Sequence, residues 1–213
     1  MRFLCLHGAG TNGEILEIQT GGLRHSLEKN GHTFQFMNGK LGAKVEEELE
    51  GVVDGPFYNH YARGDSPGSG VAEAFEHTKA IIATEGPFDG VLGFSQGAAL
   101  AASLIINHNK TRPADPPLFR VAVFICGARP WEANGTQHVV RSGEERPIGI
   151  VTANIVGKQD PLYPESMELY ELCEPSKASF YDHGSKHMVP FDLKNTGEMV
   201  RVIEEAIGKA VKG

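Results

Sequence analysis

Short apolar runs alternate along the chain with longer stretches in which apolar residues recur at roughly helical spacing. The short runs are typical of buried strands, and the longer stretches are typical of amphipathic helices. The predicted strands span residues 2–6, 32–37, 88–92, 119–126, 147–156 and 178–182. The predicted helices span residues 14–28, 71–84, 98–106, 164–172 and 195–212, the first as one helix or as two broken at Gly21-Gly22. This alternation predicts an α/β fold with a mainly parallel central sheet and helices on both faces.

The sequence Gly93-Phe94-Ser95-Gln96-Gly97 lies between a predicted strand and a predicted helix. In that position a Gly-x-Ser-x-Gly turn strains the backbone of its serine, and the flanking glycines remove Cβ atoms that would collide. The hydroxyl of Ser95 then projects above the sheet at the positive end of a helix. A serine between glycines is also common in ordinary turns, so the flanking strand and helix decide the interpretation. The pattern predicts the nucleophile elbow of an α/β-hydrolase.

A glycine-rich loop, residues 7–13, follows the first predicted strand. Such a loop leaves backbone N–H groups free to bind an anion. Beside a serine nucleophile, that anion is the oxyanion of a tetrahedral intermediate, and we expect the N–H groups of Ala9 and Gln96 to bind it. Phosphate binding is the alternative, but the loop lacks the lysine of a Walker motif and the glycine spacing of a Rossmann motif.

A serine hydroxyl needs a base to accept its proton, and nine histidines are available. His187, in the loop after the last predicted strand, is best placed, and His183 is its rival. We interpret His7 as structural to the first loop. Three others read as helix-surface residues: His25, His77 and His108.

The base needs a carboxylate to fix its tautomer and to stabilise the imidazolium. Asp160 follows a strand end, at the expected place in the hydrolase order of Ser, then Asp, then His. Asp182 and Asp192 are alternatives. The order Ser95, Asp160, His187 places all three residues at strand ends that share one edge of the sheet.

Two segments, residues 38–70 and 127–147, lack periodicity, and long irregular segments are often functional or mobile. The first concentrates aromatic residues at 55–61, which we interpret as a wall of an acyl pocket or, equally simply, as anchors of a surface loop. The second lies where strand ends open onto the cleft, so its side chains either contact substrate or pack. The candidate substrate-binding residues are Phe57, Tyr58, Tyr61, Arg129 and Trp131.

Composition narrows the function classes. The length of 213 residues predicts a single domain, 1–213, and the net charge of −7 argues against a nucleic-acid partner. The three cysteines Cys5, Cys126 and Cys173 have no metal or redox spacing, so we expect no metal or cofactor and a reducing, cytoplasmic location. The apolar run at the start of the sequence is too short for a signal peptide, so we expect none, and no apolar stretch has membrane-spanning length.

Four stretches together resemble the fungal "family of serine hydrolases", which is related to the ovarian-cancer-associated serine hydrolase of animals. They are Leu6-His7-Gly8, residues 86–100, residues 157–162 and His187-Met188-Val189-Pro190. The resemblance covers nearly the whole chain and implies an α/β-hydrolase with little or no lid, acting as a carboxylesterase or thioesterase without a cofactor. The family's nucleophile, acid and base motifs match Ser95, Asp160 and His187.

The resemblance also implies a substrate class, because family members from fungal secondary-metabolite clusters release polyketide chains from synthases. We therefore expect a serine hydrolase that cleaves small-molecule acyl esters or thioesters through an acyl-enzyme, with an acyl-carrier domain of a synthase as a further partner. One alternative is an acyltransferase in which an alcohol or amine intercepts the acyl-enzyme. The other is a non-catalytic binding module that keeps only the fold.

Overall fold

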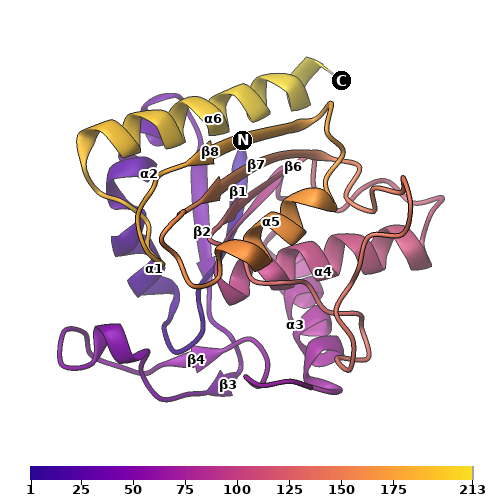
Figure 1. Ribbon diagram of the computed structural model, residues 1–213, viewed down its shortest axis with the longest axis horizontal. Coiled ribbons are helices and arrows are strands. Elements are labelled where there is room, and N and C mark those ends of the chain that lie inside the picture. Colours follow the sequence, from indigo (N-terminus) through magenta and orange to yellow (C-terminus); the bar gives the residue numbers. More distant parts are fainter. Residues whose placement is uncertain (213) are drawn as a thin grey trace.

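The computed structural model describes residues 1–212 and contains one six-stranded sheet in the order β2-β1-β5-β6-β7-β8 (Figure 1). Every pair of neighbouring strands in it is parallel. The predicted mainly parallel sheet is therefore confirmed. Its strands are β1 (Arg2–Leu6), β2 (Thr33–Met37), β5 (Gly90–Phe94), β6 (Val121–Ile125), β7 (Val151–Val156) and β8 (Ala178–Asp182).

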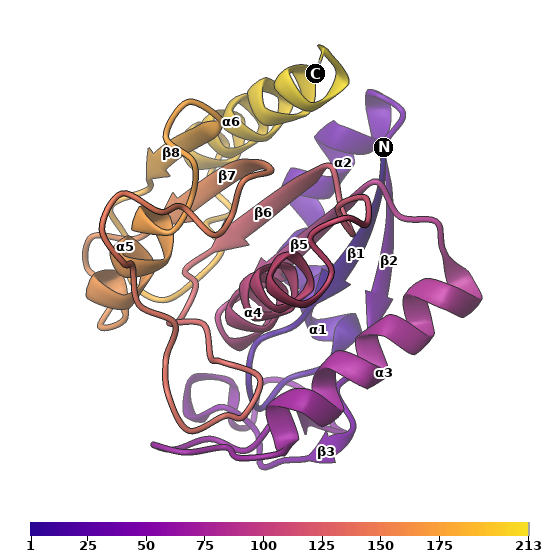
Figure 2. The same cartoon turned by 90° about the vertical axis from the view of Figure 1, so that its right-hand side faces the viewer.

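Helices cover both faces of this sheet, as predicted. Helices α1, α2 and α6 lie on one face, and α3, α4 and α5 lie on the other (Figures 1 and 2). Their bounds are α1 (Gly13–Gln19), α2 (Gly21–Lys29), α3 (Gly70–Glu85), α4 (Gln96–Thr111), α5 (Tyr163–Glu171) and α6 (Leu193–Lys212).

Strand β1 shows why the sequences of the inner strands are continuous apolar runs. Leu4 and Leu6 point into the core beneath α3 and α4, whereas Phe3 and Cys5 point into the core beneath α1, α2 and α6. Successive side chains of a strand point to opposite faces, and here both faces are covered. Each position therefore has to be apolar.

The first predicted helix is two helices, but the glycine pair is not the break. Thr20 joins α1 to α2, and its N–H and hydroxyl both donate to the Leu16 carbonyl, at 3.0 and 2.7 Å. Gly21 and Gly22 lie inside α2. The break therefore lies at Thr20, with φ −94° and ψ 5°, immediately before the glycine pair that begins α2.

Residues 38–70 form a small ribbon at the lower edge of the molecule in Figure 1. Strands β3 (Leu41–Gly42) and β4 (Tyr58–Asn59) pair antiparallel, and a short 3-10 helix, η1 (Glu47–Leu49), lies between them. The N–H of Gly10 donates to the Tyr58 carbonyl at 3.0 Å and to the side-chain oxygen of Asn59 at 2.8 Å. These bonds tie the ribbon to the loop that follows β1.

Within residues 1–212, no helix combines the length and the apolar character needed to cross a membrane.

Candidate active site

Ser95 occupies the tight turn between β5 and α4, with φ 53° and ψ −117°. Its N–H donates to the Ile125 carbonyl at the end of β6, at 3.0 Å, which holds the turn against the sheet. The flanking glycines leave room for this geometry. A Cβ on Gly93 would lie 2.5 Å from the backbone of Ala98, and one on Gly97 would overlap the carbonyl oxygen of Leu6. The strained conformation predicted for Ser95 is therefore present.

His187 and Asp160 form a hydrogen-bonded pair beside this turn. The Nδ1 of His187 lies 2.7 Å from Oδ2 of the buried Asp160, and the N–H of Leu162 donates to Oδ1 at 2.8 Å. Burial alone would raise the pKa of Asp160, but the bonds from His187 and Leu162 outweigh it, and the pKa lies below its usual value. An ionised Asp160 fixes the proton on Nδ1 and leaves Nε2 of His187 as the acceptor.

His187 and Ser95 line the same cleft. The ring of Phe94 packs against the imidazole of His187, with centroids 5.0 Å apart, and limits its rotation. Within residues 1–212 the Ser95 hydroxyl has no hydrogen-bond partner. A bond from a serine nucleophile to its histidine base often tightens only when substrate binds.

The alternative acids, Asp182 and Asp192, and the alternative base, His183, have other hydrogen-bond partners. Asp182 accepts the N–H groups of Lys158 and Gly184, and Asp192 caps the start of α6 by accepting from Asn195. The Nε2 of His183 lies 3.4 Å from the Cys126 sulfur. None of these three lines the cleft at Ser95.

Ala9 and Gln96 lie on the two segments that flank Ser95. Ala9 follows Gly8 in the loop after β1, and both line the cleft, whereas Gln96 is the first residue of α4. Neither backbone N–H donates to another residue within 1–212. Both donors are therefore available to a developing negative charge, as an oxyanion hole requires.

Two buried histidines, His7 and His60, hold the glycine-rich loop at residues 7–13 in place. Nε2 of His7 accepts the N–H of Gly39 at 2.9 Å, so Nδ1 carries the proton and donates to the Gly8 carbonyl at 2.6 Å. The ring of His60 stacks on that of His7, with centroids 4.4 Å apart. The backbone N–H of His60 donates to the side-chain oxygen of Gln96 at 2.8 Å. His7 is thus structural, as predicted.

The sequence analysis missed His60, because a histidine between aromatic residues in an irregular segment gives no signal of what it contacts. Of the histidines assigned to helix surfaces, His25 is exposed and His77 is half-buried. The assignment of His108 was wrong, because its side chain is buried and its Nε2 donates to the Pro116 carbonyl at 2.9 Å.

We expect the buried His7 to make folding sensitive to mild acid. Burial lowers its pKa from 6.5 to about 4. Between these values the unfolded chain binds the proton and the folded chain does not, so stability is lost as the pH falls. The free energy of unfolding, measured with urea, should fall by about 2 kcal/mol from this residue between about pH 7 and pH 5. His7→Asn should be less stable near pH 7 but show a shallower pH dependence; an unchanged slope would refute the assignment.

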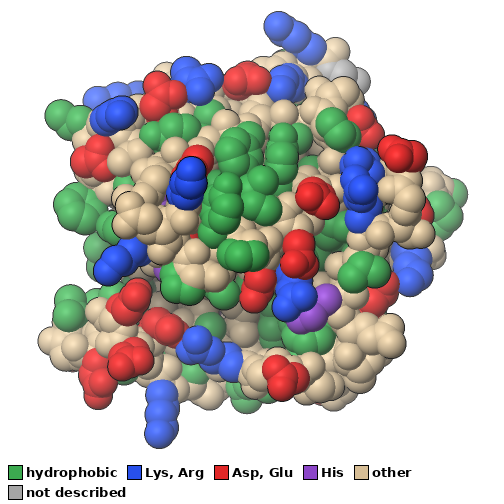
Figure 3. Space-filling view, viewed as in Figure 1, with side chains coloured by type: hydrophobic (Ala, Val, Ile, Leu, Met, Phe, Trp, Pro, Cys, Tyr) green, Lys and Arg blue, Asp and Glu red, His purple; other side chains and the backbone are tan. Residues whose placement is uncertain are grey.

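The cleft at Ser95 has a volume of about 750 Å³ and mainly apolar walls. Its apolar side chains come from α1, the ribbon segment, the start of α5 and the loop after β8, and several are strongly exposed: Ile18 is 76% and Phe191 83% accessible. Figure 3 shows hydrophobic side chains gathered in the middle of this face, over α5 and the loops beside it. The apolar and charged residues of the wall include Ile18, Leu49, Leu162, Met188, Phe191, Glu46 and Arg63.

The structure places the five candidate substrate-binding residues elsewhere, since none of them lines this cleft. Tyr58 belongs to β4, and Tyr61 is buried in the core beneath α3 and α4. Trp131 stacks on His138, with ring centroids 3.6 Å apart. The N–H of Arg129 donates to Glu165 at 3.1 Å, and Phe57 lies half-buried just before β4. Residues 38–70 do supply a wall, but through Glu46, Glu48, Leu49 and Arg63.

One cluster within residues 1–212 has the spacing of a metal site: ligand atoms of Cys126, Asp160 and His187 lie within 4.8 Å of one another. The Asp160 and His187 atoms already bond to each other. Burial raises the pKa of the Cys126 thiol, which keeps it protonated, whereas a metal ligand must be a thiolate. The donor set therefore fits a hydrogen-bonded acid and base better than a metal ion.

Solved structures with this fold include esterases. The plant protein SOBER1 from Arabidopsis thaliana matches 97% of this chain and 99% of its own with a TM-score of 0.63, at 18% identity. A carboxylesterase from Mesorhizobium loti matches 95% of this chain and 88% of its own with a TM-score of 0.62, at 17% identity. At these identities the likeness shows the fold, which is that of the α/β-hydrolases.

Curated fungal proteins are similar in sequence. Esterase FPY3 of Fusarium mangiferae is 36% identical over the full length of both chains. Esterase FUS5 of Gibberella fujikuroi is 33% identical and covers 95% of this chain and 85% of its own. Hydrolase phiM of Talaromyces stipitatus is 30% identical and covers 96% and 87%. Residues 1–199 match the family described as "Serine hydrolase (FSH1)", and the chain is therefore a member of this serine hydrolase family.

Proposed function

We propose that the protein hydrolyses acyl esters or thioesters through a covalent acyl-enzyme on Ser95. The observation that carries this proposal is the 2.7 Å bond between His187 and Asp160 in the cleft lined by a strained Ser95. That arrangement supplies a nucleophile, a base with a fixed tautomer and an orienting carboxylate. The family membership and the esterase names of its relatives support the same reaction class.

In the proposed first half-reaction, the Ser95 oxygen attacks the acyl carbonyl carbon while Nε2 of His187 accepts the hydroxyl proton. The carbonyl oxygen becomes an oxyanion, which accepts hydrogen bonds from the N–H groups of Ala9 and Gln96. When the intermediate collapses, His187 donates its proton to the leaving alcohol or thiol, and the acyl-enzyme remains. Water then attacks the acyl carbonyl with His187 again as base, which releases the acid and restores Ser95.

The walls of the cleft support an apolar acyl group. Ile18, Leu49 and Phe191 offer aliphatic and aromatic surface, and the cleft of about 750 Å³ falls in the range of drug-sized ligand sites. The exposed positions of Ile18 and Phe191 leave the acyl group open to solvent at one end. We extend the proposal to medium-to-long or polyketide-type acyl chains, including chains carried by a synthase.

Covalent labelling with a fluorophosphonate probe tests the proposal directly. The intact mass of the wild type should rise by one phosphonyl group, because an activated serine displaces the leaving group of the probe. Ser95→Ala and His187→Ala should abolish the label, while Ser185→Ala, in the same loop as His187, should retain it. Labelling that persists in Ser95→Ala, or folded wild type that does not label, would refute the proposal.

Hydrolysis and acyl transfer share this acyl-enzyme and differ in what attacks it. Analysis of the products of an ester substrate with a competing alcohol present separates them. Free acid as the main product supports hydrolysis, whereas a new ester as the main product identifies an acyltransferase.

A further inference from the structure

The turn after β6 has the same backbone character as the turn that carries the nucleophile. Within residues 1–212, Ser95 and Cys126 are the non-glycine residues with positive φ, at 53° and 46°. Ser95 directly follows β5 and Cys126 directly follows β6. Each donates its N–H to the neighbouring strand, Ser95 to the Ile125 carbonyl at 3.0 Å and Cys126 to the Ile155 carbonyl at 2.8 Å. Strained residues of this kind cluster at functional sites, so the conformation of Cys126 points to a function.

That function is not a second nucleophile. The side chain of Cys126 has no exposed surface, and it does not line the cleft at Ser95. Burial raises the pKa of the thiol, so the sulfur stays protonated and unreactive. Cys126 can therefore act only through the side chains that it contacts.

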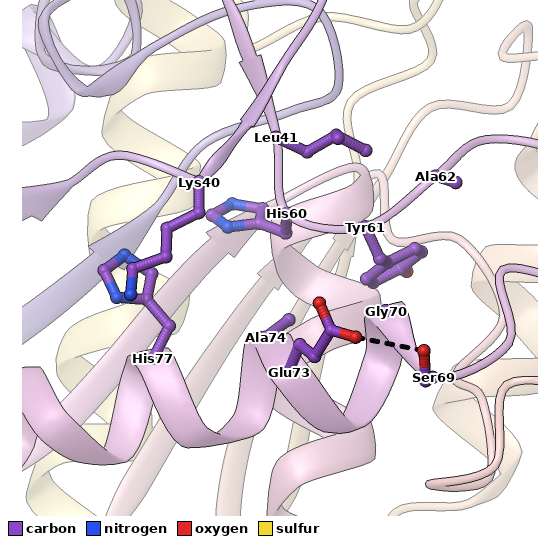
Figure 4. A pocket seen from close by; sticks show the side chains of 10 residues that line it. All are labelled: Lys40, Leu41, His60, Tyr61, Ala62, Ser69, Gly70, Glu73, Ala74 and His77. Atoms are coloured by element: carbon purple, nitrogen blue, oxygen red, sulfur yellow. Dashed lines mark hydrogen bonds between the residues drawn. The ribbon is translucent and has the colours of Figure 1, made fainter.

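One of those side chains is a buried histidine. Five histidines are buried within residues 1–212, and the proposed mechanism uses none of them as its base. His60 supports the glycine-rich loop together with His7, beside a cavity of about 330 Å³ that shares no lining residue with the cleft at Ser95 (Figure 4). His183 is different, because its ring contacts the thiol of Cys126 next to the acid–base pair.

The ring of His183 donates a hydrogen bond to that thiol. The N–H of Ser185 donates to Nδ1 of His183 at 3.1 Å, so the proton of the neutral ring is on Nε2. Nε2 lies 3.4 Å from the Cys126 sulfur. Burial lowers the pKa of His183 and keeps the ring neutral. Three nearby carboxylates oppose this shift without reversing it: Asp182, Asp160 and Asp192.

The other side of the thiol faces the catalytic loops. A thiol is both a weak donor and a weak acceptor, and the Cys126 sulfur donates to the Met188 carbonyl at 3.6 Å. Met188 directly follows His187 in the chain. The sulfur also lies within 4.8 Å of ligand atoms of both Asp160 and His187. Burial tends to raise the pKa of Asp160, and the thiol is among the groups that lower it.

Backbone contacts join the acid loop to the base loop but leave the Asp160 carboxylate to other groups. The backbone N–H of Gln159 donates to the Ser185 carbonyl at 3.1 Å, and its side chain donates to the Gly184 carbonyl at 2.8 Å. Gly157 permits this approach, because a Cβ there would lie 2.5 Å from the ring of His183. Cys126 therefore supplies a contact from the end of β6 to both loops at once.

We propose that Cys126 is a positioning residue whose thiol links His183 to the loops of Asp160 and His187 and holds the acid–base pair in its bonded geometry. The inference rests on the proposed esterase mechanism and deepens it. His183 acts here through the thiol and transfers no proton to substrate. A displacement of about 1 Å in such a pair can lower a rate by about a hundredfold, so a buried link of this kind matters to turnover.

Steady-state kinetics with an activated ester measure the effect. Cys126→Ala should lower kcat by about tenfold or more and leave KM within about twofold, because the walls of the cleft are unchanged. Cys126→Ser keeps a donor and an acceptor and should restore kcat to within about threefold of the wild type. Cys173→Ala is the matched control, since it removes another buried thiol, which donates to the Leu169 carbonyl at 3.6 Å, and it should keep the wild-type kcat.

Nitrogen NMR of the His187 ring tests the link without turnover. Correlations from its carbon-bound ring protons report the chemical shift of Nδ1, which depends on the tautomer that Asp160 fixes. In Cys126→Ala this shift should move toward that of the exposed His25, whereas in Cys126→Ser and Cys173→Ala it should stay at the wild-type value. If Cys126→Ala does not fold, His183→Ala removes the other end of the link and should give the same loss of kcat and the same shift.

Three results would each overturn the proposal: a wild-type kcat in Cys126→Ala, equal losses in Cys126→Ala and Cys126→Ser, or an unmoved Nδ1 signal in Cys126→Ala. The first two report on turnover and the third on the link alone. A chain that hydrolyses no ester but shows the Nδ1 shift in Cys126→Ala would refute the proposed function and retain the link.

Discussion

Ser95→Ala is expected to lower kcat/KM for an activated ester by about a million-fold, to the residual rate that binding and the oxyanion hole provide. The loss is this large because the substitution removes the atom that forms the acyl-enzyme, so the two easy steps revert to direct attack by water. The fold should be unaffected. The Ser95 hydroxyl has no partner within residues 1–212, and alanine carries the same Cβ in the same backbone conformation.

Substitutions of His187 and Asp160 test the same mechanism a second time. Asp160→Asn keeps the shape but reverses the bond to His187, so Nε2 becomes protonated and kcat should fall by about ten thousand-fold. Adding His187→Ala or Asp160→Asn to Ser95→Ala should cost nothing further, because the three act as one unit. Initial rates for the single and double variants, with circular dichroism as the folding control, decide this. Additive losses would mean that Ser95 does not act through His187.

The parts of the site that were predictable are those fixed by backbone geometry. Ser95 is found from its neighbours because the turn tolerates no Cβ at Gly93 or Gly97. Asp160 and His187 follow β7 and β8, and parallel strands bring their carboxyl ends to one edge of the sheet. Periodicity located the strands and helices for the same reason, since each apolar position faces a covered surface.

The walls of the cleft were not predictable, because they depend on side chains from segments without periodicity. We expected aromatic residues of the ribbon to line the cleft. Burial of apolar surface is non-directional, however, so an aromatic side chain is stabilised at any position that removes it from water. Tyr61 reaches the core beneath α3 and α4, and Trp131 reaches the same core while its backbone N–H donates to the Ser103 hydroxyl at 2.8 Å. Leu49 and Phe191 line the cleft instead, and nothing in their local sequence marks them.

The glycine at the start of α4 explains why the oxyanion hole and the nucleophile stay together. Gly97 lets α4 lie directly against the end of β1, where a Cβ would overlap the Leu6 carbonyl oxygen and crowd that of His7. This contact is between two backbones, so no side-chain rotation can relieve it. The same approach brings the N–H of Gln96 beside the loop that carries Ala9, and any shift of α4 would separate the two donors.

Gly97→Ala is therefore expected to destabilise the protein by about 4 kcal/mol or more, which for a chain of ordinary stability removes much of the folded population. Gly208→Ala is the matched control, because Gly208 lies in α6 and a Cβ there meets nothing within 4 Å. That variant should be stabilised by about 0.5–1 kcal/mol, as alanine favours a helix interior. Urea unfolding of both variants measures the difference. A Gly97→Ala protein as stable as the wild type, with full esterase activity, would show that α4 can move away from β1 without cost, and the close approach would then not be what aligns Gln96 with Ala9.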